Sequence, residues 1–202
     1  MCRLFLLTIL IANFYTGLGQ EIRNQLAKIN TVEDAEEFIN SNPGSVANLI
    51  SIESSRDTSA ILRSLYSEKS GFTFSIGRSN YKILKIDSAL SFRVHFIFLS
   101  GEIYTKPQAD SIRKEIISKL KSGTKFYDLV YEYNIDQNFA GDTGWFTENM
   151  MVKEFENAVK DNKLHDIFMV DIPEKNWYHV VWKTYPDTYI KTVTMIQIKT
   201  EK

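Results

Sequence analysis

Two of the three histidines in this chain of 202 residues stand inside apolar stretches. His95 lies in FRVHFIFL (residues 92–99), and His179 lies in WYHVVW (residues 177–182). Two imidazole rings that meet can hold each other's tautomer and orientation, because each neutral ring has one donor and one acceptor. The two histidines therefore predict a joint site if their strands are neighbours. The alternative is two separate core residues, each with its own hydrogen-bond partner.

Other kinds of chemistry find little support in the residue types. The third histidine, His165, lies in a polar turn, and no HExxH-type spacing is present, so we expect no metal and no cofactor. No GxSxG motif is present either, which speaks against a serine hydrolase. Cys2 is the single cysteine. Since it lies at the extreme N-terminus, the chain after the leader has no thiolate nucleophile.

The stretch GDTGWFTENMMVKEF (residues 141–155) combines a tight turn with large apolar side chains. Two glycines in four residues mark backbone that needs a positive φ or a close approach. Phe146 follows the turn, and Met151 and Phe155 are four residues apart, so we expect the latter two to share one helix face. The pattern predicts one wall of a concave apolar site. Ordinary core packing is the alternative.

The apolar periodicity predicts an α+β fold in which helices pack on an antiparallel sheet. An N-terminal region has a helix capped by Thr31 and a hairpin over residues 72–86, whereas residues 46–52 remain ambiguous between strand and helix. From residue 92 onward the expected order is strand, two helices, loop, helix and strands. The expected ranges are strand 92–99, helices 106–120 and 126–133, a helix running through Val159, and strands within 164–172, 177–182 and 188–198.

The first nineteen residues differ from the rest in composition. A short basic start precedes the apolar run Leu4–Phe14, and Gly17 and Gly19 supply small residues before Gln20. This pattern predicts a secretory signal peptide cleaved after Gly19, hence export to the periplasm or medium, with no stable membrane span after cleavage. An uncleaved N-terminal anchor is the alternative. The net charge of −1 gives no drive toward nucleic acid.

The segment from residue 92 to 184 resembles the parvulin-type peptidyl-prolyl cis/trans isomerase (rotamase) family. Six motifs in the family's order carry the resemblance, and GDTGWF is the most specific of them. They are RVHFIF (93–98), KLKSGTKF (119–126), YNID (133–136), GDTGWF (141–146), MVKEFE (151–156) and YHVV (178–181).

The resemblance implies a four-stranded antiparallel sheet wrapped by helices, and a site for the Xaa-Pro bonds of unfolded or folding polypeptides. It implies that His95 and His179 form an inner pair, with Asp136 as the acidic catalytic residue. The implied substrate-binding residues are Thr143, Phe146, Met151 and Phe155. The chain departs from the family at Thr143, which makes that wall more polar, and at Glu174 and Trp177, near the second histidine.

These observations divide the chain into a signal peptide (1–19), an N-terminal region (20–90), an isomerase domain (91–185) and a tail strand (186–202). The N-terminal region has a strand-turn-strand rhythm similar to that of residues 164–184, which predicts either a degenerate half-repeat or a simple hairpin. For the function, an exported chaperone-like module that binds unfolded chains with little or no isomerase activity is the alternative.

Overall fold

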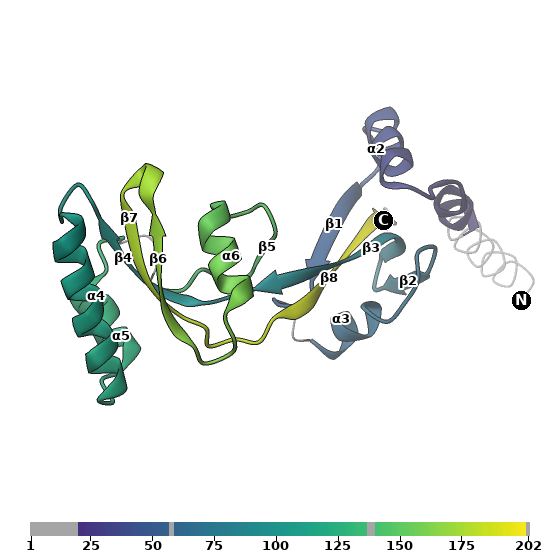
Figure 1. The fold of residues 1–202 in the computed structure, drawn as a ribbon. Coiled ribbons are helices and arrows are strands. Elements are labelled where there is room, and N and C mark those ends of the chain that lie inside the picture. The colour runs from purple at the N-terminus through teal and green to yellow at the C-terminus, as the bar shows by residue number, and fades with distance from the viewer. Residues whose placement is uncertain (1–19, 57–58, 137–139, 201–202) are drawn as a thin grey trace, which may run out of the picture. The chain divides into compact units, whose positions relative to one another are not determined.

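The computed structural model describes residues 20–56, 59–136 and 140–200 (Figure 1). The predicted signal peptide lies outside the described residues. The described chain divides into two compact units: residues 20–88 with 190–200, and residues 89–189. The second unit is thus inserted in the sequence between the two segments of the first. Within the described ranges, no helix combines the length and the apolar character that a membrane crossing requires.

The first unit is built on the sheet order β1-β8-β3-β2. Its elements are a helix over residues 20–28, α2 (Val32–Ser41), β1 (Ala47–Glu53), α3 (Ala60–Leu65), β2 (Thr73–Ile76), β3 (Ser79–Phe92) and β8 (Thr188–Lys199). The hairpin is confirmed, with Ile76 paired to Ser79 across the turn, and so is the Thr31 capping box. The ambiguous residues 46–52 form a strand, since β1 pairs with the C-terminal strand β8. The half-repeat stays a prediction.

The second unit contains a three-stranded antiparallel sheet in the order β4-β7-β6. Its elements are β4 (His95–Ser100), α4 (Lys106–Lys121), α5 (Phe126–Tyr133), β5 (Phe146–Thr147), α6 (Lys153–Asp161), β6 (Ile167–Ile172), η1 (Pro173–Lys175) and β7 (Trp177–Trp182). The expected order of strands and helices is confirmed, and the α+β class with it.

The expected count of four strands in this sheet is wrong for the described residues. The segment that could supply a fourth strand runs beside β4, where Gly141 O accepts from Phe96 N (2.8 Å) and Thr143 N donates to Val94 O (3.1 Å). It forms only an isolated bridge, between His95 and Asp142. The positive φ angles of Gly141 (72°) and Gly144 (64°) bend the backbone out of the extended conformation that a longer ladder needs.

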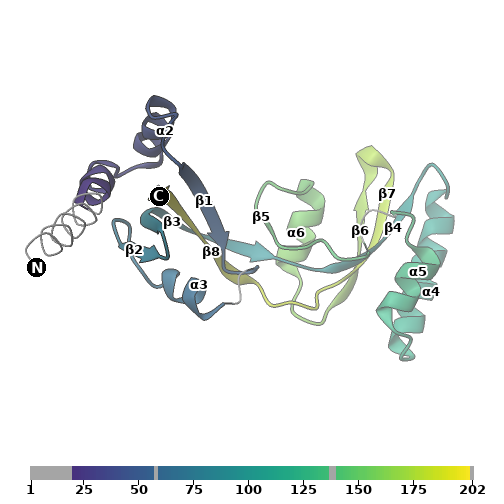
Figure 2. The ribbon, with the colours of Figure 1, turned by 180° about the vertical axis from the view of Figure 1, so that it is seen from behind.

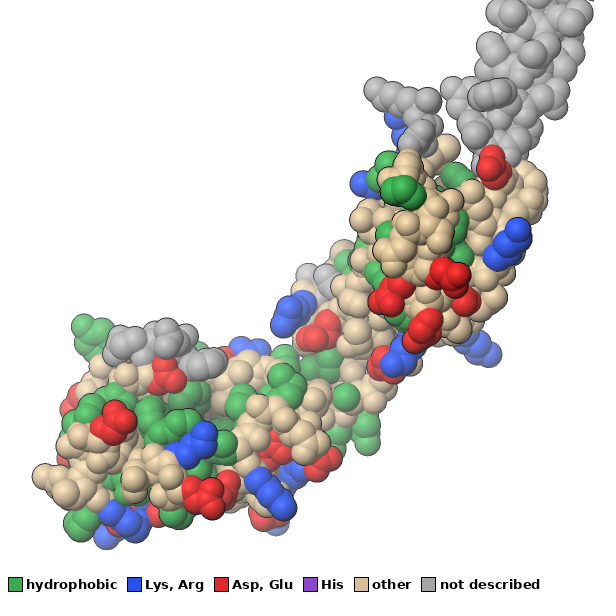
Figure 3. All heavy atoms as spheres, turned by 90° about the horizontal axis from the view of Figure 1, so that it is seen from above, with side chains coloured by type: hydrophobic (Ala, Val, Ile, Leu, Met, Phe, Trp, Pro, Cys, Tyr) green, Lys and Arg blue, Asp and Glu red, His purple; other side chains and the backbone are tan. Residues whose placement is uncertain are grey.

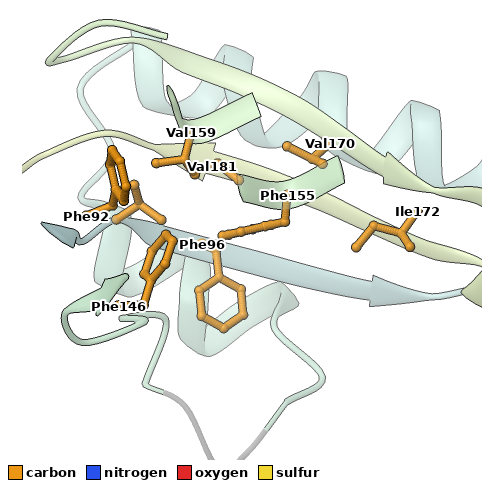
Figure 4. Packing of buried hydrophobic residues seen from close by; sticks show 9 residues of the cluster. Phe92, Phe96, Phe146, Phe155, Val159, Val170, Ile172 and Val181 are labelled. Carbon is orange, nitrogen blue, oxygen red and sulfur yellow. The ribbon is translucent and has the colours of Figure 1, made fainter. Parts of the chain in front are cut away.

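The two faces of the β4-β7-β6 sheet bury different clusters, because side chains alternate along each strand. One face, called the α6 face, packs Phe96, Val170 and Val181 against Phe155 and Val159 of α6. Figure 4 shows Phe155 lying between α6 and the sheet, beside Phe96 and Val181. The other face, called the α4–α5 face, packs Ile97 and Val180 against helices α4 and α5. Figures 1 and 2 show α6 and the α4–α5 pair on opposite sides of these strands.

Candidate functional site

The strand register separates the two histidines that the sequence places in one site. β4 and β7 are neighbours, as predicted, and His179 pairs with Phe98 while His95 pairs with Trp182. Directly opposed residues point to the same face, and Phe98 and His95 are three residues apart on β4. His179 therefore lies on the α6 face and His95 on the α4–α5 face. The expected inner histidine pair is wrong, and Phe96 contacts His179 in its place, with ring centroids 6.2 Å apart.

His95 is held by partners of its own. Its Nδ1 lies 2.7 Å from Thr184 Oγ1, and its Nε2 lies 3.2 Å from the Tyr127 hydroxyl. The ring is buried and packs on Phe126 at 5.6 Å. Burial lowers the pKa of His95, Asp142 raises it and Arg93 lowers it further. His95 is thus a hydrogen-bonded core residue of the α4–α5 face, which is the alternative that the sequence left open.

A pocket of about 350 Å³ opens on the α6 face. Five of the seven predicted site residues line it: Asp136, Thr143, Met151, Phe155 and His179. Its other walls are mainly apolar and aromatic, from Phe96 and Phe98 on β4, Ile172 on β6 and Trp177 on β7. The volume is in the range of ligand sites, which are concave and apolar with a few placed polar groups.

Phe146 and Phe155 both belong to the core under this pocket. Phe146 is 1% exposed and does not line the pocket, although its ring lies 6.4 Å from that of Phe155. Phe155 lines the pocket but is itself only 5% exposed. Phe146 is therefore a support beneath the wall, and Phe155 is wall and core at once.

The Gly-Asp-Thr-Gly turn is fixed to β4 by its side chains. The Asp142 carboxylate accepts from Arg93 Nε (2.9 Å) and Nη2 (2.5 Å) and from Gly144 N (2.9 Å). Burial raises the pKa of Asp142, but the hydrogen bonds from Arg93 and Gly144 outweigh it and the pKa is lowered. Asp142 therefore stays ionised and pins the turn.

Thr143 uses its hydroxyl within this turn. Its Oγ1 accepts from Val94 N (3.1 Å) and lies within donor reach of Val94 O (3.2 Å) and Gly144 O (2.8 Å). Since one hydroxyl has one proton to donate, the backbone takes up its donor capacity. The expectation that Thr143 makes this wall more polar is therefore weakened by the local hydrogen bonds.

Met151 reaches the pocket from a loop and not from a helix. Helix α6 begins at Lys153, so the expectation that Met151 and Phe155 share a helix face is wrong. The buried Glu156 carboxylate accepts from Met151 N (2.9 Å) and Asn149 N (3.1 Å). Burial raises the pKa of Glu156, but these backbone hydrogen bonds lower it overall. An ionised glutamate one turn into α6 thereby folds the loop back and sets the position of Met151.

Asp136 is positioned by a neighbour that sequence reasoning missed. The buried Asn134 accepts from Phe98 N (2.8 Å) through Oδ1 and donates to Asp136 O (2.9 Å) through Nδ2. Ile135 N also donates to Phe98 O (3.2 Å). These hydrogen bonds tie the loop after α5 to β4 and bring the half-buried Asp136 to the pocket.

His179 is a buried polar group on the α6 face. Its ring stacks on Phe98 at 5.1 Å and meets Phe155 edge-on at 5.4 Å. Burial lowers the pKa of His179 to about 4, with a smaller lowering by Arg113, against a backbone hydrogen bond at Val170 that raises it. The imidazole is neutral at pH 7, so the pocket presents a polar but uncharged ring between two aromatic ones.

Sequence reasoning missed Phe96, Phe98, Ile172 and Lys175 as pocket residues. In FRVHFIFL the positions 92, 94, 96 and 98 are all apolar, which is typical of core packing, and the alternation that tells the two faces apart is lost after His95. The signal that could have found them is the partner strand, where Trp177 and His179 share one face by their spacing of two.

The family model of the PPIC-type PPIASE domain matches residues 81–183, just over half of the chain. The foldase protein PrsA of Geobacillus kaustophilus is 42% identical over 57 residues, which span 27% of this chain and 20% of that protein. The matched segment is thus about a fifth of the length of this curated relative.

Two solved structures are similar at 26% sequence identity. One is the peptidylprolyl isomerase PrsA from Bacillus anthracis, with a TM-score of 0.41 over 50% of this chain and 43% of that one. The other is NmPin, the parvuline of Nitrosopumilus maritimus, with a TM-score of 0.36 over 46% of this chain and 97% of that one. Both TM-scores are below 0.5.

Proposed function

This chain belongs to the family of PPIC-type PPIASE domains, and we propose that it is a peptidyl-prolyl cis/trans isomerase whose site is the pocket on the α6 face. One observation carries the proposal. Five residues that the family resemblance implies for the site, scattered between positions 136 and 179, line one apolar pocket.

The reaction that such a pocket can assist is rotation about the Xaa-Pro amide bond. The barrier for a peptide bond is about 18–20 kcal/mol, and uncatalysed exchange at proline takes tens of seconds or longer. No covalent bond breaks. The twisted amide has lost its resonance dipole, so it loses less than the planar amide does when it leaves water. An apolar pocket that excludes water therefore favours the twisted state.

We assign the binding of the proline ring to Met151 and Phe155. Phe155 meets Phe96 edge-on at 6.4 Å, so its ring is held in one orientation. The Glu156 hydrogen bond fixes the backbone of Met151 opposite. Methionine adapts its shape to irregular contacts, which suits a ring that moves during the reaction. Thr143 completes this end of the pocket.

We assign the polarity of the site to His179 and Asp136. A neutral imidazole can orient a rotating carbonyl without a charge that would bind the planar amide just as well. Asp136 lies half-buried on the lining and adds a carboxyl group to it. Neither group is a nucleophile in this scheme, and catalysis is non-covalent. His95 has no part in it.

The substrates in this proposal are unfolded or folding polypeptides that contain proline. We also propose that the protein is exported, because the predicted signal peptide precedes Gln20. Charged side chains of both signs are interspersed on the face shown in Figure 3, and the net charge is −1, which agrees with a neutral peptide as the ligand.

A chaperone-like binding module remains the second candidate, and Phe96 favours it. The resemblance implies a histidine on β4 that contacts His179, but in this pocket the Phe96 ring makes that contact. The pocket is therefore better suited to binding an apolar segment of chain than to polarising an amide. The experiment is exchange NMR of a short Xaa-Pro peptide with the full chain, alongside an assay of aggregation of an unfolded protein. Accelerated cis/trans exchange supports the isomerase. Suppressed aggregation without accelerated exchange would favour the binding module.

A further inference from the structure

The pocket extends beyond the residues assigned to the proline ring. Four aromatic rings lie in a row along it, in the order Phe155, His179, Phe98 and Trp177. The centroids of successive rings are 5.4, 5.1 and 5.6 Å apart. His179 and Trp177 are two residues apart on β7, which is about 7 Å at the rise of a strand. A proline ring held at Phe155 therefore leaves the Trp177 end of the pocket uncontacted.

The Trp177 side chain contacts two neighbours, and the backbone just before it is fixed. Its ring meets Phe98 edge-on at an interplanar angle of 77°, and Lys175 Nζ lies 4.6 Å from the ring centroid. The preceding residue, Asn176, has a left-handed backbone (φ 52°) and its carbonyl accepts from Gly101 N at 2.7 Å. A Cβ on Gly101 would come within 2.5 Å of Asn176 Cβ, so the turn is packed closely against the end of β4.

We propose that Trp177 and Phe98 form a second subsite, which binds a large aromatic side chain near the proline in the substrate. The inference rests on the proposed function, since it names the substrate class of the same pocket. A half-buried indole beside a phenyl ring offers edge-to-face contacts that a small side chain cannot make. The nearby Lys175 ammonium disfavours a basic side chain at this end, so the subsite selects aromatic over basic residues.

The test uses the full chain and six peptides that share one proline. One peptide has alanine at the flanking positions, four have a single phenylalanine at one of the two positions before or after the proline, and the sixth has lysine at the position that phenylalanine favours. For the wild type we expect one phenylalanine position to raise kcat/KM about tenfold over alanine, in line with a well-placed aromatic contact. Lysine at that position should give no such gain.

Variants of Trp177 test whether the preference for phenylalanine depends on the indole ring. Trp177→Ala should bring the phenylalanine-to-alanine ratio of kcat/KM close to one, and Trp177→Phe should restore most of it. Tyr131→Ala removes an aromatic side chain that is 95% exposed on α5 and should leave the ratio unchanged. A ratio near one for the wild type, or a tenfold ratio that survives Trp177→Ala in folded protein, would overturn the proposal.

Peptide affinity separates this inference from the proposed function. If all peptides are isomerised at the same rate and bound with the same affinity, the isomerase function is supported and the subsite is contradicted. If no peptide is isomerised but the phenylalanine peptide binds about tenfold more tightly through Trp177, the subsite stands and the isomerase fails.

Discussion

The two faces of the β4-β7-β6 sheet carry one histidine each, and the two rings have opposite surroundings. On the α4–α5 face, His95 has partners for both ring nitrogens, Thr184 and Tyr127. On the α6 face, His179 lies between Phe98 and Phe155 and lines the pocket. The strands and their apolar composition are alike, so the difference comes from what each face packs against. Helices α4 (16 residues) and α5 (8 residues) together cover one face, whereas α6 (9 residues) and the loop before it pack on the other face, beside the pocket.

A matched pair of phenylalanines gives the largest expected effect on stability. Phe155 on the α6 face is 5% exposed and Phe126 on the α4–α5 face is 4% exposed. Truncating either to alanine removes a buried ring and should cost about 3–5 kcal/mol of unfolding free energy. The two variants should differ in activity. We expect kcat/KM per folded molecule to fall for Phe155→Ala and to remain unchanged for Phe126→Ala. Denaturant melts together with turnover on the folded fraction measure both, and an equal activity loss would remove the distinction.

Gly141→Ala should disturb the packing of the glycine turn against β4 and α5. Gly141 has a φ of 72°, and an added Cβ would lie 2.5 Å from Val130 Cγ2 and 3.0 Å from Phe96 O. Strain and overpacking together should cost about 3 kcal/mol in the free energy of unfolding. Gly144 also has a positive φ, 64°, but open space around it, so Gly144→Ala is the matched control and should cost about 1 kcal/mol. Equal losses of stability would show that packing against α5 does not constrain the turn.

The pH dependence of stability should report the burial of His179. Its pKa is about 4 when folded and about 6.5 when unfolded, so between these values the unfolded chain binds a proton that the folded chain does not. Stability is therefore unaffected by this group above pH 6.5 and falls as the pH drops toward 4, with a slope of up to about 1.4 kcal/mol per pH unit. The pKa of His95 is also lowered, so it adds to this loss.

Urea titrations at pH 7, 6 and 5 measure this slope. His179→Gln should flatten it by removing the more strongly shifted histidine, while the His95 contribution remains. A slope that His179→Gln leaves unchanged would contradict the assignment of a buried neutral imidazole to the α6 face.

A pair of methionines gives the smallest change in stability with a clear change in activity. Met151 lines the pocket, whereas Met169 pairs with Val180 and so lies on the other face, 37% exposed. Met151→Ala should lower kcat/KM about tenfold, since it removes apolar contact with the proline ring while the loop is still held through its backbone by Glu156. Met169→Ala should change neither kcat/KM nor Tm measurably. Equal turnover by the two variants would remove Met151 from the site.

The sequence predicts most of the elements because each has a local signal. Helix α5 and strand β7 begin and end where apolar periodicity places them. The pocket residues Thr143, Met151 and Phe155 follow from the motif around the glycine turn.

The face of the sheet on which each side chain lies, and the tertiary hydrogen bonds, could not be predicted in the same way. From Phe96 to Leu99 the strand is apolar on both faces, so pairing with β7 decides that Phe96 and not His95 faces the pocket, and a shift of one residue exchanges the two. Likewise, the exact start of α6 depends on the Glu156 carboxylate binding the loop before it, which is a tertiary contact of a residue that reads as surface charge.

The central claim is that isomerisation takes place on the α6 face, and the two histidines test it most directly. The measurement is the rate of cis/trans exchange of an Xaa-Pro peptide by NMR with the full chain, its His179→Gln variant and its His95→Gln variant, each corrected for the folded fraction. We predict that the wild type accelerates exchange, that His179→Gln loses about tenfold or more of that acceleration, as expected for a group that contacts the rotating amide, and that His95→Gln retains it. Loss of acceleration in His95→Gln with retention in His179→Gln would contradict the account, because the active face would then be the one that α4 and α5 cover.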